Sequence, residues 1–278
     1  MIESFKKFKR LFTFGCSFTM HKWPTWPHIL ASEIDDVELF NFGKAGASNM
    51  LISLRLAEAN RRYKFNDTDL VAIMWTSNTR EDKFIHDFGW ICTGNIYNQD
   101  ILPQEYVKKF ADPDGYLIRD YALMELTNGY LKSLPSTSIQ MLGWTPGLIE
   151  NIEDQDNAFS QNIHDRLVEL YSDNFKNFTT NMRDWINLTY WKEDTAKHYD
   201  MAGYIYLSNG KMHNDGHPRP IIFYEYLKYL GLPLTDKSRH YTNKMEDLLL
   251  QCKTEQDIHN TFQDVYMNNN PEGRGQIF

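Results

Sequence analysis

The segment DLVAIMWT, residues 69–76, constrains the fold more than any other because it is a nearly continuous apolar run. A strand shows this pattern when helices cover both faces of its sheet, as in the parallel sheets of α/β proteins. Two shorter apolar runs, at residues 11–14 and 37–42, predict further strands before it.

Two segments with helical features separate these strands. Residues 26–34, WPHILASEI, carry Pro27 near their start, a position that helices favour. Residues 48–63 begin with Ser48 and Asn49, which are good caps, and continue with apolar residues at helical spacing. The order strand, helix, strand, helix, strand predicts a three-layer α/β fold with a flavodoxin-like parallel sheet.

The middle of the chain is less regular and rich in Trp, Tyr, Asn and Asp. It predicts helices at residues 116–134 and 163–178, with a strand between them at 137–144. Because no Pro, Gly or Ser linker marks a boundary, we expect a large, mostly helical insertion of about residues 85–210 within one domain, residues 1–235.

The last part of the chain reads as helices. Residues 221–231, IIFYEYLKYLG, form a helical pattern that Gly231 and Pro233 end. One or two further helices follow in residues 241–267. We therefore expect a helical C-terminal extension, residues 236–278, that finishes in a polar tail.

Charge and cysteine content exclude several classes of protein. The 29 Lys and Arg residues against 37 Asp and Glu give a formal net charge of −8 without a basic block, so a nucleic acid partner is not expected. Cys16, Cys92 and Cys252 are far apart and form no CxxC pair, which indicates neither a disulfide framework nor a zinc site. The acidic segments lack a calcium-loop pattern, so we expect no metal and no cofactor.

No segment approaches the roughly 18 apolar residues of a membrane span. The apolar run after the basic residues KKFKR is also shorter than the apolar core of a signal peptide, which has ~7–15 residues. These features predict a cytoplasmic protein without a membrane partner.

The chemistry begins with FGCSFT, residues 14–19, at the end of the first predicted strand. Ligands bind at the carboxyl ends of strands in such sheets, so Ser17 is a candidate nucleophile. Its hydroxyl needs a base, and the segment HNDGHPRP, residues 213–220, supplies histidines in a loop before a helix. Cys16 is a rival nucleophile unless it is a buried core thiol.

Four segments, in the same order along the chain, resemble the motif blocks of the SGNH (GDSL-like) hydrolase family. FGCSFT resembles the first block, with Ser17 at the nucleophile and Cys16 where the family often has Asp. NFGKAGASN resembles the second block, and Gly46 matches its oxyanion-hole glycine better than Gly43 does.

The other two blocks depart from the family pattern. MWTSNTRED resembles the third block, with Asn78 at its Asn and Thr76 in place of the usual Gly. DGHP resembles the last block, with His217 at the general base and Asp215 at its carboxylate partner. The family's Asp-x-x-His spacing would place that partner at Asn214, so the loop is one residue shorter here.

The resemblance covers roughly residues 10–80 and 210–231. FTFGCSFT followed by WPTW also resembles phage-encoded SGNH-like proteins of unassigned substrate. The resemblance of the four blocks to the hydrolase family implies catalysis by Ser17, His217 and Asp215. It also implies an oxyanion hole formed by the backbone N–H groups of Ser17 and Gly46 and the amide of Asn78.

The implied function is an esterase or deacetylase that acts on an acylated sugar or other small ester through an acyl-enzyme. An acyltransferase that uses the same site is one alternative. A catalytically silent SGNH-like binding module is another, because the third block is altered and the Asp–His spacing is shortened.

Each of these residues also has a purely structural explanation. Ser17 and Thr19 are suited to cap a helix that starts near Met20. Gly46 suits a turn and Asn78 an Asx-turn. His217 before a proline suits an exposed loop.

Further side chains are candidates for substrate binding. Trp23 and Trp26, together with His21 before them, suit an aromatic wall for a sugar or acyl group, whereas a Trp pair near proline also suits a packed core or a loop anchor. Arg80, followed by Glu81 and Asp82, suits a polar substrate or else a solvated salt-bridge cluster.

Overall fold

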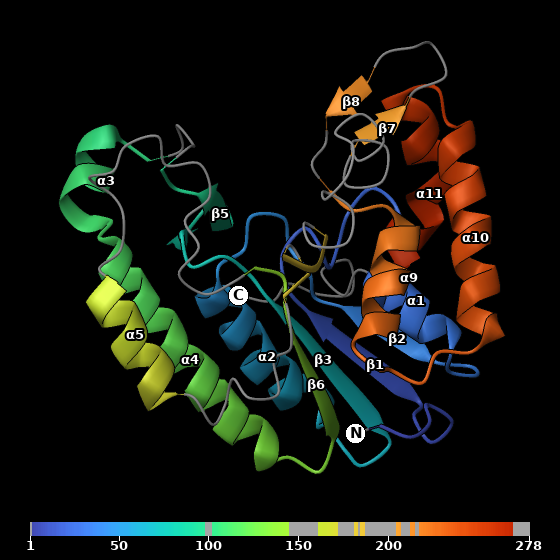
Figure 1. Ribbon diagram of the computed structural model, residues 1–278, viewed down its shortest axis with the longest axis horizontal. Helices are drawn as coiled ribbons and strands as arrows, with labels where there is room; N and C mark the ends of the chain where they lie inside the picture. Colours follow the sequence, from blue (N-terminus) through green and yellow to red (C-terminus); the bar gives the residue numbers. More distant parts are fainter. Residues whose placement is uncertain are drawn as a thin grey trace.

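The computed structural model describes residues 2–97, 102–144, 161–171, 181–182, 184–186, 204–206, 212–214 and 217–268. Four parallel strands form the central sheet in the order β2-β1-β3-β6 (Figure 1). Their bounds are β1 Arg10–Phe14, β2 Glu38–Asn41, β3 Asp69–Trp75 and β6 Thr137–Leu142. The parallel α/β sheet predicted from the sequence is confirmed, and all of β3 is buried.

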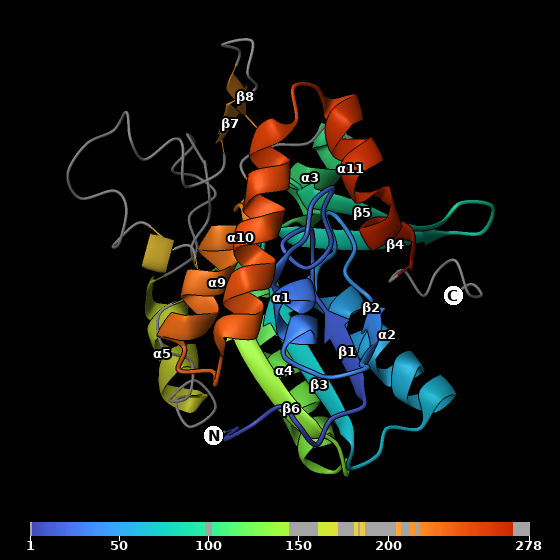
Figure 2. The ribbon, with the colours of Figure 1, turned by 90° about the vertical axis from the view of Figure 1, so that its right-hand side faces the viewer.

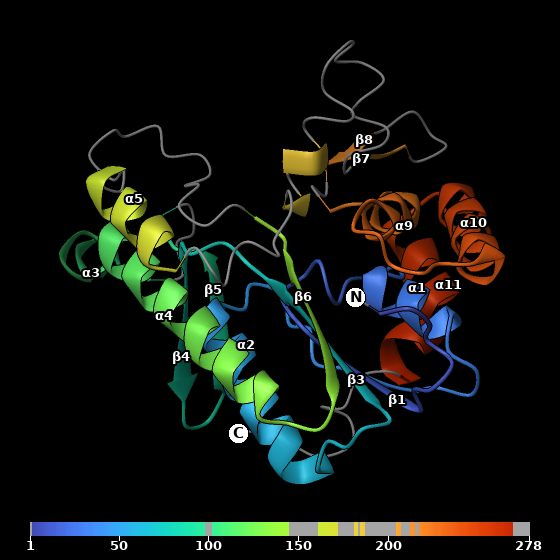
Figure 3. The ribbon, with the colours of Figure 1, turned by 60° about the horizontal axis from the view of Figure 1, so that its bottom comes forward.

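Alternation of side chains along the strands creates two apolar faces. One face is rich in aromatic rings, and Phe12 of β1 stacks on Phe40 of β2 with ring centroids 4.7 Å apart. Helices α2 (Asn49–Tyr63) and α4 (Pro113–Lys132) cover this face. Helices α1 (Trp26–Ser32) and α9 (Pro220–Tyr229) cover the other face, which gives three layers (Figure 3).

The predicted helices begin where their caps are. Ser48 accepts a hydrogen bond from the backbone N–H of Leu51 and starts α2. The N–H of Thr25 donates to Nδ1 of His28 at the start of α1. Pro220 stands in the first turn of α9, where its missing N–H costs nothing.

The middle of the chain differs from the expected insertion. β6 pairs with β3, and α4 packs with α2 against the sheet, so these two elements belong to the central layers and not to a cap. The expectation for residues 85–210 is wrong at this point. Helices α3 (Gln104–Phe110) and α5 (Gln161–Leu170) lie outside α4, and the remainder of the helix predicted to residue 178 lies outside the described residues.

An antiparallel hairpin, β4 (Arg80–Ile85) and β5 (Gly89–Asn95), follows β3 and was not predicted. Figure 2 shows it near the carboxyl ends of the sheet strands, with its turn projecting from the body. A second small hairpin pairs β7 (Tyr204–Tyr206) with β8 (Met212–Asn214).

The C-terminal extension is helical, as predicted, in α10 (Asp236–Gln251) and α11 (Glu255–Asn268). These helices bury Trp23 in a cluster of their own apolar side chains: Met245, Leu249, Cys252, Ile258 and Phe262. The carboxylate of Glu33 accepts hydrogen bonds from Thr235 and Ser238, which fixes the start of α10 beside α1. The expected polar tail lies outside the described residues, and the domain division at residue 235 stays a prediction.

Among the described helices, none combines the length and the apolar character needed to cross a bilayer.

Candidate active site

Ser17 lies in a tight turn directly after β1. The N–H groups of Thr19 and Met20 both donate to the carbonyl of Cys16, at 2.9 and 3.2 Å, and this closes the turn around the serine. No helix begins near Met20, because the chain runs on irregularly to Thr25, the N-cap of α1. The helix-cap explanation for Ser17 is therefore wrong. Ser17 is 8% exposed and lies at the carboxyl edge of the sheet, directly after β1.

The two tryptophans that follow Ser17 are buried and hydrogen-bond to segments at the carboxyl edge of the sheet. Trp26 is fully buried, and its indole Nε1 donates to the hydroxyl of Thr19 in the serine turn. Trp23 is 1% exposed, and its Nε1 donates to the carbonyl of Pro218, 2.9 Å away. The packed-core explanation for both rings is confirmed and the substrate wall is wrong, because buried rings offer no surface to a substrate. They hold in place the turn of Ser17 and the residue after His217.

His217 reaches the same edge from the segment before α9. Its ring stacks on His21 with centroids 3.9 Å apart and planes 17° apart. It also meets the ring of Phe18 edge-on, with centroids at 5.7 Å. Because Phe18 is the neighbour of Ser17, the histidine lies against the turn that carries the serine. It is half-buried in an aromatic cluster, so the explanation as an ordinary exposed loop residue is wrong.

The predicted carboxylate partner, Asp215, lies outside the described residues. The backbone of Asn214 is described and ends β8, where it pairs with Tyr204.

Gly46 occupies the loop after β2 in a left-handed conformation, with φ +76°, that favours glycine. A Cβ there would also lie 3.1 Å from the backbone N of Gly94 in β5. The carbonyl of Gly46 accepts a hydrogen bond from that N–H, so the β4–β5 hairpin fixes this loop. Gly43 has a different role, because a Cβ there would lie 2.8 Å from the N of Met20 at the end of the serine turn.

Asn78 follows β3 and is 2% exposed. Its neighbours Ser77 and Thr79 hydrogen-bond to each other through their hydroxyls at 2.9 Å. Thr76, which stands where the family has Gly, is bound through its backbone: its N–H donates to Oδ1 of Asn49, and its carbonyl accepts from Nδ2 of Asn49. The start of α2 and the loop after β3 are thus joined by the amide side chain of Asn49.

Two buried carboxylates, which we call the carboxylate clamp, accept hydrogen bonds from the residues at the start of α2. Asp120 of α4 accepts a hydrogen bond from Nδ2 of Asn49 at 2.7 Å, and Asp82 of β4 accepts from the N–H and the hydroxyl of Ser48. Burial raises the pKa of Asp120 to about 6, against the opposing effect of Arg119. Burial also raises the pKa of Asp82, against the hydrogen bonds from Ser48.

Sequence analysis missed the clamp, although one signal was present. Asp120 falls on the buried stripe of α4, between Leu117 and Met124, where an apolar residue is expected. A carboxylate at such a position indicates a buried polar partner.

Arg80, the first residue of β4, contacts the serine turn through Trp144. Its guanidinium lies over the ring of Trp144, 4.9 Å from the centroid, and Trp144 packs on Phe18 at 4.3 Å. Within the described residues, its Nε and Nη1 are buried and have no hydrogen-bond partner.

The two carboxylates after Arg80 point elsewhere. Glu81 accepts hydrogen bonds from the hydroxyls of Tyr106 and Tyr116 and pairs with Lys83, whereas Asp82 is in the clamp. The prediction of a solvated salt-bridge cluster at residues 80–82 is therefore wrong.

The thiols are poor nucleophile candidates. Cys16 has no exposed surface, so the structure contradicts its role as a rival to Ser17. Burial, reinforced by the charge of Asp82, raises the pKa of Cys92 to about 12 and keeps it protonated near neutral pH.

No protein-family model matches the chain, and no curated protein matches it either. Among solved structures, it is similar to a catalytic mutant of Axe2, an acetylxylan esterase from Geobacillus stearothermophilus, at 16% identity over 82% of this chain and 96% of that one, with a TM-score of 0.45. It is also similar to the protein YxiM from Bacillus subtilis, at 12% identity over 83% of this chain and 59% of that one, with a TM-score of 0.44.

Proposed function

We propose that this protein is a serine hydrolase of the SGNH type, an esterase or deacetylase that acts on an acylated sugar or other small ester through an acyl-enzyme. The observation that carries the proposal is the packing of His217 against Phe18 and His21, which brings an imidazole to the turn of Ser17 at the carboxyl edge of the sheet.

In the proposed reaction, Oγ of Ser17 attacks the ester carbonyl while His217 takes its proton. His217 then returns the proton to the leaving alcohol, and the acyl group stays on the serine. In the second half, water attacks the acyl carbonyl while His217 takes its proton. The bond to Oγ of Ser17 then breaks, His217 returns the proton to Oγ, and the carboxylic acid leaves. Asp215 orients the imidazole in this scheme.

The oxyanion would be bound by the N–H groups of Ser17 and Gly46 and the amide of Asn78. Neither N–H donates a hydrogen bond to any residue in the described part of the chain. Loss of a single such donor typically costs about 10²–10³ in turnover. The fixed loops after β2 and β3 suit this role, since the donors must be held before the charge develops.

Hydrolysis of p-nitrophenyl acetate tests the proposal. We expect Ser17→Ala to abolish turnover above the buffer rate and Cys16→Ala, the matched neighbour, to retain most of it. Activity that survives Ser17→Ala but not Cys16→Ala would show the wrong nucleophile. A wild-type protein with no turnover and an intact far-UV circular dichroism spectrum would favour a silent binding module.

A further inference from the structure

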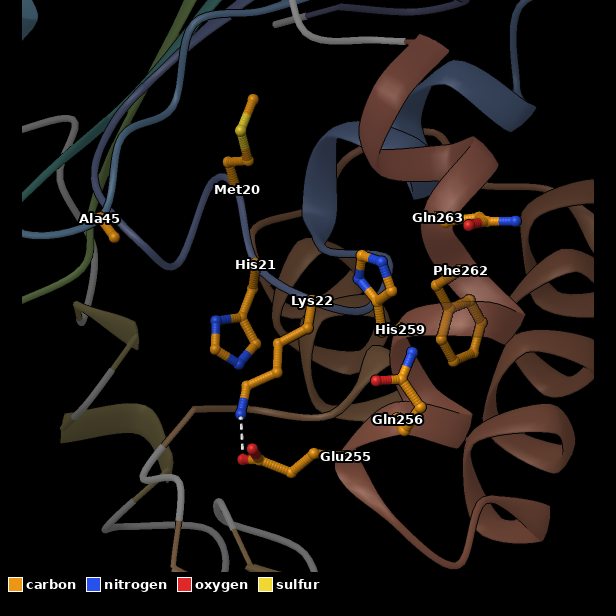
Figure 4. A pocket seen from close by; sticks show the side chains of 9 residues that line it. All are labelled: Met20, His21, Lys22, Ala45, Glu255, Gln256, His259, Phe262 and Gln263. Carbon is orange, nitrogen blue, oxygen red and sulfur yellow. Dashed lines mark hydrogen bonds and ion pairs between the residues drawn. The ribbon is translucent and has the colours of Figure 1, made fainter.

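A pocket of about 630 Å³ lies between the loop after the serine turn and α11 (Figure 4). Met20, His21 and Lys22 line it from the loop, and Gln256, His259 and Gln263 line it from the helix. Its volume is in the range of about 300–1,000 Å³ that is typical of small-molecule sites.

The pocket adjoins the proposed catalytic centre at two points. His21 lines the pocket and also stacks on His217 at 3.9 Å. Ala45, on the side of the pocket away from α11 in Figure 4, lines it directly before Gly46. The pocket is therefore next to the proposed centre through one residue that stacks on the proposed base and one that precedes the proposed oxyanion glycine.

The lining groups define the chemistry of the ligand. Nζ of Lys22 pairs with the carboxylate of Glu255 at 2.9 Å, so these two charges offset each other (Figure 4). The amides of Gln256 and Gln263 are uncharged donors and acceptors, and the side chain of Met20 adds apolar surface. The imidazoles of His21 and His259 add further hydrogen-bonding groups, and such a lining suits a neutral group with hydroxyls.

We propose that this pocket binds the saccharide portion of the ester substrate, which is the alcohol that leaves from the acyl-enzyme. The inference rests on the proposed function. It assigns α11, which lies outside the segments that resemble a hydrolase, as part of the substrate site. The helix would hold the sugar while Ser17 attacks its acyl group.

A pair of variants on α11 tests the pocket. Gln263→Trp places a large ring in it, whereas Asp264→Trp puts the same ring on the next exposed residue, which does not line the pocket. Gln256→Trp is a second filling variant on the pocket side. Circular dichroism confirms folding of all three.

Saturation-transfer difference NMR with methyl xyloside, methyl glucoside and methyl N-acetylglucosaminide measures binding without turnover. We expect at least one glycoside to bind wild type and Asp264→Trp equally, and to bind both filling variants about ten-fold or more weaker. Absence of binding of all three glycosides to wild type, or binding that the filling variants leave unchanged, would overturn the pocket assignment.

Turnover of p-nitrophenyl acetate, which has no sugar, separates this inference from the proposed function. We expect wild type and Asp264→Trp, whose ring does not line the pocket, to hydrolyse it equally. If wild type hydrolyses the aryl acetate and the glycoside results are negative, the pocket assignment fails alone. If a glycoside binds as expected and no ester is hydrolysed, the proposed function fails alone.

Discussion

At the residue scale, two histidines stack in one cluster, but only one has the proposed role of base. His217 meets Phe18 beside the serine, whereas His21 packs between His217 and Trp23 and lines the pocket. The choice between them rests on which ring is next to the serine turn.

We predict that His217→Gln lowers the turnover of p-nitrophenyl acetate by roughly 10²–10⁴-fold, the usual contribution of a general base. His21→Gln should cost much less, because it removes a stacking partner and not the base. Steady-state kinetics of both variants gives the comparison. The reverse order of effects would assign the base to His21.

The shortened Asp–His spacing gives a second prediction at this scale. Asp215→Asn should lower turnover by orders of magnitude, since the same exchange costs about 10⁴ in serine proteases by favouring the wrong imidazole tautomer. Asn214→Asp should change little. Wild-type turnover in Asp215→Asn would show that another group orients His217.

At the scale of elements, the carboxylate clamp connects α4 and β4 to the start of α2, at Asn49 and Ser48. Asp120 has a raised pKa, so its protonated form is favoured in the folded state relative to the unfolded chain. The stability that comes from this group is fully present below the unfolded pKa of about 4 and is lost as the pH rises through about 6.

We therefore predict that acidification from pH 7 to pH 4 raises the free energy of unfolding of wild type relative to Asp120→Asn. The change should be on the order of 3 kcal/mol, from a pKa shift of about two units. Urea unfolding of both proteins at several pH values measures it. A difference that is independent of pH, or that falls on acidification, would refute the raised pKa.

Helices and strands were predictable from the sequence where local features, such as an apolar run or a capping residue, determine them. β3 is apolar because both of its faces are buried, and α2 begins at Ser48 because its hydroxyl caps the first turn. The β4–β5 hairpin was missed because β4, with the sequence REDKFI, carries four charged residues in a row. Its stability comes from contacts that sequence spacing does not show, such as Phe84 on Trp90 and Gly94 on Gly46.

In the candidate site, too, local motifs were recognisable and contacts between distant segments were not. Ser17 and His217 were recognisable from short motifs at strand and helix ends, and the structure places their segments in contact. The side chains that bury Trp23 were not predictable, because they belong to the α10 and α11 segment, more than 200 residues later in the chain.

At the scale of the whole molecule, the C-terminal helices are part of the same packed body as the sheet. Trp23 joins them to the segment of His217 through its bond to Pro218, and Lys22 pairs with Glu255 across the pocket rim. The ion pair is exposed and contributes at most about 1 kcal/mol, so the apolar cluster around Trp23 dominates this contact.

We predict that Leu249→Ala, in that cluster, lowers the free energy of unfolding of the whole chain by about 2–5 kcal/mol. Leu250→Ala, its exposed neighbour on α10, should have a small effect. Urea unfolding followed by tryptophan fluorescence and by far-UV circular dichroism should give one coincident transition. A separate early transition that Leu249→Ala alone shifts would show that the extension unfolds independently.

The central claim is that Ser17 is an activated nucleophile. Reaction with a fluorophosphonate probe, followed by intact-mass and peptide mass spectrometry, tests it most directly, because such probes bond covalently to a serine whose base accepts its proton. We predict one adduct on wild type, located on Ser17, equal labelling of Cys16→Ala, and none on Ser17→Ala. A folded wild-type protein that stays unlabelled, or an adduct that persists on Ser17→Ala, would contradict the account.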